Sequence, residues 1–242
     1  MPQHPPETRP LYVFGYGSLM WRPDFPFVRS APALARGFRR RLCVWSNAYR
    51  GSPERPGLVF GLDRGPTDQA AKGVLFEVAP RHRRETIAYL FRRELIYPIY
   101  EAATVQAEAE GWRARALTFL VDRDDPAYAG DLAAKVRIAA IATGTGQAGR
   151  ARDYLENALL RLRQMEAPEP ELEAELAEAD RLPDDPAVLF RLLDEPLRRR
   201  LDLVFKPSHE RPAVEAGRDR PQKLDHDPSP AFPERVPAPE KS

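Results

Sequence analysis

The feature that most constrains the fold is a change in the type of secondary structure along the chain. Six early segments have the β-branched, aromatic and aliphatic residues of strands, between turns rich in Pro, Gly and Asp: residues 11–14, 38–46, 57–63, 72–78, 104–109 and 114–121. One helix is predicted among them, over residues 81–95. Helices dominate afterwards, over residues 131–142, 150–165 and 185–204. Strands followed by helices favour an α+β fold over alternating βαβ units.

The same pattern divides the 242 residues into a folded part and two ends. We expect one compact domain over residues 11–165. A C-terminal helical extension over residues 166–205 follows it, in which a charged, Glu-rich connector precedes the last helix. Residues 206–242 are rich in Pro, Glu, Arg and Asp and have too little apolar surface to fold, so we predict a disordered tail there and a disordered N-terminus over residues 1–10.

The balance of charge limits the expected partners. Lys and Arg number 37 against 36 Asp and Glu, a formal net charge of +1, so neither nucleic acid nor an acidic membrane surface is expected as the main partner. The arginine-rich runs at residues 38–41 and 81–84 adjoin apolar residues and are expected to form solvated faces. No apolar run approaches the roughly 20 residues that span a bilayer, and residues 1–10 lack the apolar core of a signal peptide. We therefore expect a cytoplasmic protein.

Cysteine and histidine are too sparse to suggest a metal site. Cys43, the single cysteine, lies in an apolar run with Val44 and Trp45, which predicts a small buried side chain. The four histidines lie far apart in the sequence and show no metal-ligand spacing. We expect no bound metal.

The stretch YVFGYGSLMW, residues 12–21, ends a strand abruptly. Tyr12 to Phe14 suit a buried strand, whereas Gly15, Gly17 and Ser18 mark a sharp departure from it. Glycine at these positions permits a positive φ and lets another group come within contact distance of the backbone. From the residues alone, an ordinary β-turn and an anion- or substrate-binding loop both remain open.

A second glycine-rich stretch, GTGQAG at residues 144–149, fits the pattern G-x-G-x-x-G of dinucleotide-binding proteins. That fingerprint requires a strand in front of it and a parallel sheet around it, whereas the residues in front of this stretch predict a helix. We interpret residues 144–149 as the end of one helix and the beginning of the next. No cofactor is expected.

One acidic residue lies on an apolar helix face. At about 100° per residue, the helix predicted over residues 81–95 places Glu94 within a stripe formed by Ile87, Leu90, Phe91 and Leu95, and Glu85 on the opposite side. A carboxylate that loses hydration has a raised pKa and is suited to proton transfer near neutral pH. The alternative is a glutamate at the end of a helix paired with a neighbouring arginine such as Arg92 or Arg93.

Four blocks of the sequence together resemble the ChaC family of glutathione-specific γ-glutamylcyclotransferases. These are VFGYGSLMW at residues 13–21, AYLFRRE at 88–94, DPAYAG at 125–130 and GRARDYL at 149–155, in matching order and spacing. The resemblance extends from about residue 11 to residue 165. It implies a compact β-barrel with packed helices. It also implies cleavage of glutathione, a small-molecule substrate, into 5-oxoproline and cysteinylglycine without a metal or cofactor.

The resemblance further implies which residues form the site. Glu94 would be the general acid/base. The loop that would hold the γ-glutamyl group consists of Val13, Phe14, Gly15, Tyr16, Gly17, Ser18 and Leu19. In the implied reaction the α-amine of the γ-glutamyl residue attacks its own γ-carbonyl, and backbone N–H groups of the loop stabilise the oxyanion.

Two departures from the family pattern concern the pocket of the leaving group. Many relatives have a glycine shortly after the catalytic glutamate, where this chain has LIY at residues 95–97, and some have an asparagine where this chain has Ala151. Other γ-glutamyl amines or dipeptides therefore remain an alternative substrate class, and a non-catalytic protein that binds a small ligand or a partner is a further alternative. Retention of Glu94 argues against the latter, because a pocket for an anion gains nothing from another carboxylate. Tyr128 and Tyr154 could line the pocket, although packing is the expected role of each.

Overall fold

The computed structural model describes residues 9–206 of the chain. The segments for which we predicted disorder, residues 1–10 and 206–242, lie outside that range except at their inner ends. In the part that the structure describes, no helix combines the length and apolar character needed to cross a membrane.

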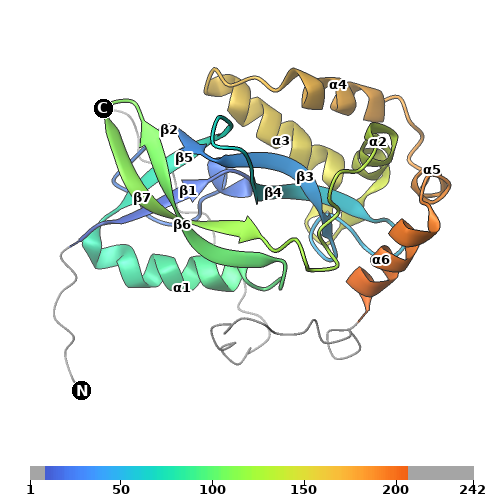
Figure 1. Ribbon diagram of the computed structural model, residues 1–242, viewed down its shortest axis with the longest axis horizontal. Helices are drawn as coiled ribbons and strands as arrows, with labels where there is room; N and C mark the ends of the chain where they lie inside the picture. The colour runs from blue at the N-terminus through green and yellow to red at the C-terminus, as the bar shows by residue number, and fades with distance from the viewer. Residues whose placement is uncertain (1–8, 207–242) are drawn as a thin grey trace. The chain divides into compact units, whose positions relative to one another are not determined.

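Seven strands form one strongly curved sheet in the order β1-β5-β2-β6-β7-β4-β3 (Figure 1). Their bounds are β1 (Leu11–Gly15), β2 (Arg29–Arg36), β3 (Phe38–Ser46), β4 (Gly57–Arg64), β5 (Ala70–Val78), β6 (Tyr100–Ala109) and β7 (Trp112–Val121). An additional pairing of β1 with β7 closes β1, β5, β2, β6 and β7 into a five-stranded barrel, and β4 and β3 continue the sheet beyond β7. The predicted α+β fold with a compact barrel is confirmed.

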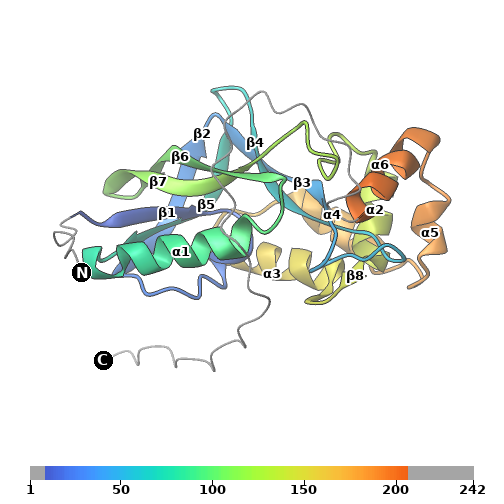
Figure 2. The same cartoon turned by 90° about the horizontal axis from the view of Figure 1, so that it is seen from below.

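The helices occupy two places around the sheet (Figures 1 and 2). Their bounds are α1 (Arg83–Glu94), α2 (Ala134–Thr143), α3 (Ala151–Gln164), α4 (Pro170–Ala179), α5 (Ala187–Phe190) and α6 (Glu195–Phe205), with short 3₁₀ turns η1 (Ser18–Met20) and η2 (Pro80–His82). Helix α1 runs along the barrel, whereas α2 to α6 gather beside β3 and β4. The sheet therefore has helices from two different parts of the chain around it.

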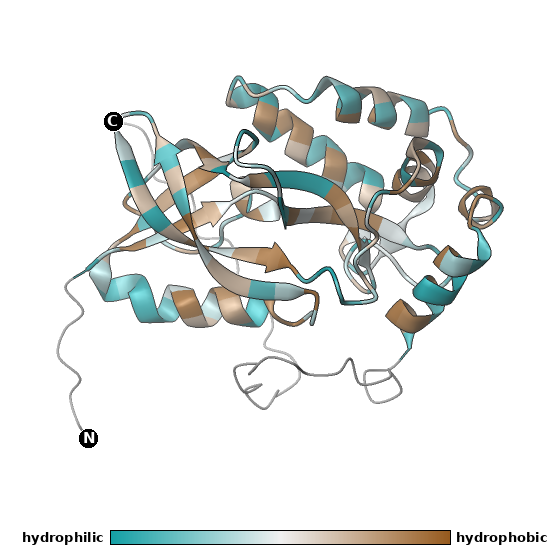
Figure 3. Cartoon of the chain, in the orientation of Figure 1, coloured by the Kyte–Doolittle hydropathy of each residue, from teal (hydrophilic) through white to brown (hydrophobic). Residues whose placement is uncertain are grey.

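Hydrophobic residues recur along the strands and on helices α2 and α3 (Figure 3). Apart from Ile99, which directly precedes β6, the largest fully buried side chains belong to the barrel strands, to β3 and β4 and to the helices that cover them: Trp45, Phe14, Phe60, Phe119, Leu58, Leu62, Leu75, Leu90, Ile141, Leu155 and Leu159. Cys43 is fully buried among them, as predicted, and burial raises the pKa of its thiol to about 12. At neutral pH this thiol is an inert part of the core.

One strand was not predicted. Residues 29–36, RSAPALAR, contain two arginines and a proline, a composition that argues against a strand inside a sheet. In the structure β2 pairs with β5 over its whole length, but with β6 only from Ala33 to Ala35. Pro32 lies outside that shorter ladder. The neighbouring strands impose the extended conformation that the local sequence does not favour.

Two predicted elements in the C-terminal part need correction. The helix expected over residues 185–204 is two helices, because Asp194 begins a second one by accepting a hydrogen bond from the Leu197 N–H at 3.0 Å, with a proline in its first turn. The Glu-rich connector contains helix α4, which buries Leu176 and Ala179. Its acidic residues obscured this apolar side.

Candidate active site

Two strands, β1 and β4, pair with the same edge of β7, so the sheet divides into two branches there. β1 pairs with β7 at Leu117, and β4 pairs with the same edge at Leu120. The carbonyl of Phe119, between these two pairings, accepts a hydrogen bond of 2.8 Å from the hydroxyl of Tyr16. The chain that leaves β1 is thus fixed at the point where β1 and β4 diverge, which we call the β7 fork.

After β1 the chain turns into η1, with the Met20 N–H donating to the Gly17 carbonyl at 2.9 Å. Neither glycine of this turn adopts the positive φ that glycine permits, and the φ of Gly17 is −117°. Glycine is needed at both positions because neighbouring atoms pack closely against the backbone. A Cβ on Gly15 would lie 2.8 Å from the Cβ of Leu19, and one on Gly17 would lie 2.9 Å from the hydroxyl oxygen of Tyr154.

The predicted loop contributes its backbone more than its side chains. Val13 and Phe14 belong to β1 and are fully buried, and Tyr16 and Leu19 are also buried. Within residues 9–206, the N–H groups of residues 17–19 donate no hydrogen bond to a backbone carbonyl. They are free to bind the carbonyl or carboxylate oxygen of a ligand.

Glu94 is the last residue of α1 and continues its most buried row. Thr86 and Leu90, eight and four residues earlier, are 1% and 0% exposed, and the side chain of Glu94 is 19% exposed. Burial raises the pKa of Glu94, and the neighbouring positive charge of Arg93 acts in the opposite direction. Glu85, with a side chain 79% exposed, faces solvent as predicted.

Arg93 joins the loop after β1 to the end of α1. Its guanidinium donates to the Ser18 hydroxyl at 2.9 Å, to the Arg22 carbonyl at 2.7 Å and to the Tyr89 hydroxyl at 2.7 Å. Its Nε lies 3.2 Å from Oε1 of Glu94. The two interpretations of Glu94, a buried acid and an acid beside an arginine, therefore both hold. Sequence reasoning treated Arg93 only as a partner of Glu94, because nothing local indicated its contact with Ser18.

The charge of Glu94 acts on three tyrosines, Tyr16, Tyr100 and Tyr154. Burial raises the pKa of Tyr16, Tyr100 and Tyr154, and in each case the negative charge of Glu94 adds to this effect. The hydroxyl of Tyr100 donates to the Phe60 carbonyl at 3.0 Å, and the hydroxyl of Tyr154 accepts from the Phe60 N–H at 3.3 Å. These phenols therefore stay protonated at neutral pH. No local pattern indicated Tyr100, since β6 brings it here from a separate segment of the chain.

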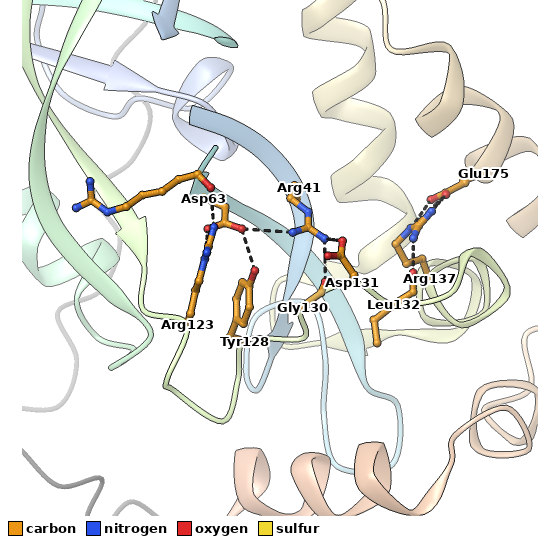
Figure 4. Close-up of polar contacts among 10 residues, drawn as sticks. Arg41, Asp63, Arg123, Tyr128, Gly130, Asp131, Leu132, Arg137 and Glu175 are labelled. Atoms are coloured by element: carbon orange, nitrogen blue, oxygen red, sulfur yellow. Dashed lines mark hydrogen bonds and ion pairs between the residues drawn. The ribbon is translucent and has the colours of Figure 1, made fainter. Parts of the chain in front are cut away.

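Tyr128 lies in a different polar cluster (Figure 4). Its hydroxyl donates to Oδ2 of Asp63 at 2.8 Å, and Asp63 also binds Arg123 at 2.7 Å and Arg41 at 3.3 Å. We call these four residues the Asp63 cluster. Burial opposes ionisation of Asp63, but hydrogen bonds from Arg123 and Tyr128 and the charges of both arginines hold its pKa below the ordinary value. Of the two tyrosines considered from the sequence, the structure brings only Tyr154 to Glu94.

The GTGQAG stretch has a structural task. It follows helix α2, as predicted, and forms a small hairpin of β8 (Thr145–Gly146) and β9 (Gly149–Arg150) before α3 begins. The Gln147 N–H donates to the Ala48 carbonyl at 2.7 Å, and the Ala148 N–H to the Tyr49 carbonyl at 2.8 Å. The hairpin therefore holds the loop between β3 and β4.

The chain is similar to known proteins in sequence and in fold. The family model described as ChaC-like protein matches residues 11–179. The glutathione-specific γ-glutamylcyclotransferase 1 of Danio rerio is 34% identical over 148 residues, which cover 60% of this chain and 75% of that protein. The glutathione-specific γ-glutamylcyclotransferase of Escherichia coli is 30% identical over 151 residues, covering 62% of this chain and 64% of the relative.

A solved structure shows the same fold. The crystal structure of the yeast γ-glutamyl cyclotransferase specific to glutathione superposes with a TM-score of 0.64 at 23% identity, over 71% of this chain and 96% of the yeast chain. The family match covers the barrel, α1 and α3, and so includes the β7 fork, Glu94 and the three tyrosines. On this evidence the chain belongs to the ChaC-like protein family.

Proposed function

We propose that this protein is a γ-glutamylcyclotransferase that cleaves glutathione into 5-oxoproline and cysteinylglycine. The observation that carries the proposal is the position of Glu94, a largely buried carboxylate joined through Arg93 to the loop whose N–H groups are free. The names of the relatives from Danio rerio and Escherichia coli support the same substrate. A cytoplasmic location stays a prediction from the sequence.

In the proposed reaction the substrate supplies its own nucleophile. The α-amine of the γ-glutamyl residue attacks the γ-carbonyl carbon, a C–N bond closes the five-membered ring, and the bond to the cysteine nitrogen breaks. Glu94 accepts the proton lost by the amine and returns it to the leaving nitrogen. Burial, which raises the pKa of Glu94, suits the side chain to both transfers near neutral pH.

The loop after β1 has two tasks in this mechanism. Its free N–H groups, at residues 17–19, stabilise the negative charge on the γ-carbonyl oxygen during attack. Because the reaction is intramolecular, the protein gains most by holding the γ-glutamyl chain in a bent, near-attack shape. We propose residues 11–165 as the catalytic domain, since Glu94, Arg93 and the three tyrosines lie within it, and residues 166–205 as a helical extension.

A comparison of glutathione with its N-acetyl derivative tests the proposal. The purified protein is expected to release 5-oxoproline from glutathione and none from N-acetylglutathione, because the acetylated nitrogen cannot attack. An α-ammonium group has a pKa of about 8, and the free amine is the nucleophile. The rate is therefore expected to rise with pH through the neutral range. Free glutamate as the first product, or turnover of N-acetylglutathione, would identify a hydrolase instead.

A further inference from the structure

The loop between β3 and β4, residues 47–56, places an arginine beside the candidate active site. The guanidinium carbon of Arg50 lies 5.8 Å from the centre of the Tyr154 ring, and Nη1 donates to the Arg150 carbonyl at 3.3 Å. The Arg50 N–H donates to the Ser46 hydroxyl at 2.9 Å. The arginine is thus fixed at its backbone, and its charged group lies over a tyrosine whose hydroxyl faces Gly17.

The loop is held on two sides. The β8–β9 hairpin binds the carbonyls of Ala48 and Tyr49, and a Cβ on Gly146 would lie 2.6 Å from the Gly51 nitrogen. On the other side, the ring of Tyr49 packs edge-on against the ring of Tyr97, with 5.6 Å between centroids. Because Tyr97 follows Glu94 by three residues, this contact brings the loop to the rim of the site. The loop therefore holds the guanidinium of Arg50 in position before any ligand binds.

Among the described residues, the guanidinium of Arg50 has no acidic partner. Within residues 9–206, no Asp or Glu side chain lies within ion-pair distance of it, and the nearby carboxylate of Asp153 pairs with Arg152 at 3.6 Å. Burial lowers the pKa of Arg50; electrostatic interactions with Tyr154 and Asp153 oppose this effect, and the positive charge of Arg22 adds to it. A partly buried cation that lacks a counter-ion is costly to keep desolvated, and an anionic ligand would relieve that cost.

The substrate of the proposed function has a carboxylate that the loop after β1 does not use. Glutathione carries one carboxylate on its γ-glutamyl end and another on its glycine, two residues from the scissile bond. A two-residue peptide extends about 7 Å, which is long enough to pass the side chain of Tyr154. We propose that Arg50 binds the terminal carboxylate of the leaving dipeptide and so selects γ-glutamyl peptides over γ-glutamyl amines. This inference rests on the proposed function.

The test compares glutathione with glutathione amidated at its glycine carboxylate, with 5-oxoproline as the measured product. Charge-assisted hydrogen bonds between guanidinium and carboxylate are the strong class. We therefore expect the wild type to process the amide with kcat/KM lower by roughly 10- to 100-fold, in line with about 1.5–3 kcal/mol for such bonds. Arg50→Gln is expected to lower kcat/KM for glutathione by a similar factor and to change that for the amide little.

A matched control and a conservative variant complete the design. Arg36→Gln removes an exposed arginine on β2 that pairs with Glu108, and it is expected to keep the wild-type ratio of the two substrates. Arg50→Lys is expected to retain part of the preference for the carboxylate. Equal kcat/KM of the wild type for acid and amide would overturn the role of Arg50, and so would equal losses for both substrates in Arg50→Gln. Absence of 5-oxoproline from both substrates with the wild type would instead overturn the proposed function and this inference with it.

Discussion

Replacing Asp63 with asparagine tests the energetics of the fold without reference to any activity. The side chain is 1% exposed and accepts hydrogen bonds from Arg123, Tyr128 and Arg41. Asparagine has one acceptor oxygen, and its NH₂ group would point at donors that the second carboxylate oxygen now binds. The variant therefore loses about two hydrogen bonds to a charged group, each worth roughly 1.5–3 kcal/mol, partly offset because asparagine is less costly to bury than a carboxylate.

The expected loss of unfolding free energy is about 2–4 kcal/mol at pH 7. For a domain of this size, each kcal/mol corresponds to roughly 2–4 °C, so Tm should fall by about 4–16 °C. Thermal and urea unfolding, followed by circular dichroism, measure this difference. Asp124→Asn is the matched control, since this exposed neighbour has a side chain without a partner in the described chain, and its Tm should stay within about 1–2 °C of the wild type.

The pH dependence provides the sharper test. Because the native pKa of Asp63 lies below the unfolded value, its stabilising contribution is fully present above the unfolded pKa of about 3.9. It is lost as the pH falls through the native pKa. The difference between wild type and Asp63→Asn should therefore narrow in acid. A difference below about 1 kcal/mol at pH 7, or one that does not change on acidification, would refute the assignment of a paired, ionised Asp63.

Three further predictions concern the candidate site. Glu94→Gln should lower 5-oxoproline release by roughly 10²–10⁴. Because the native pKa of Glu94 is raised, its wild-type stabilising contribution is lost as the pH rises above the ordinary glutamate pKa. The Tm of Glu94→Gln at pH 8 should therefore equal or exceed that of the wild type. Glu85→Gln, at an exposed position, should change neither 5-oxoproline release nor Tm. Arg93→Met removes the cation that lowers the pKa of Glu94, so the acid limb of the pH–rate profile should move to higher pH, and an unmoved limb would restrict Arg93 to holding the loop. Tyr154→Phe should reduce turnover about tenfold or more, whereas Tyr128→Phe should mainly reduce the free energy of unfolding, by about 1–2 kcal/mol. A loss of turnover in Tyr128→Phe with a loss of stability alone in Tyr154→Phe would contradict the separation of the candidate site from the Asp63 cluster.

Most of the fold could be predicted because local and long-range preferences agree. Strand β3, for example, coincides with the predicted residues 38–46, where aromatic and β-branched side chains already favour an extended chain. Strand β2 could not be predicted, since its conformation depends on partners that lie far along the chain. Helix α4 was missed because its apolar side is narrow and its acidic residues are many.

The residues of the candidate site were likewise predictable only in part from the sequence. The helical period placed Glu94 on a buried row, which the structure confirms, while its catalytic role and those of residues 13–19 stay predictions. Tyr100 and Arg50 had no local signal, because each acts through a contact made by a distant segment. Gly15 and Gly17 were recognised as special for two reasons, a positive φ and a close approach to the backbone, and the structure shows only the close approach. A sequence shows that a side chain is forbidden at such a position, and only the fold shows which neighbour forbids it.

The β7 fork also determines when the site can form as the chain is synthesised. Tyr16 and the Phe119 carbonyl that it binds are 103 positions apart, and the hydroxyl of Thr118 reaches the Phe14 carbonyl across 104 positions. At about 5–20 residues per second, β1 leaves the ribosome several seconds before β7 exists. Contacts of such long range close late in folding, after local helices such as α1. Nascent chains that end before β7 can already pair β1 with β5, but the edge of β1 that faces β7 and the loop after β1 still lack their contacts with Thr118 and Phe119.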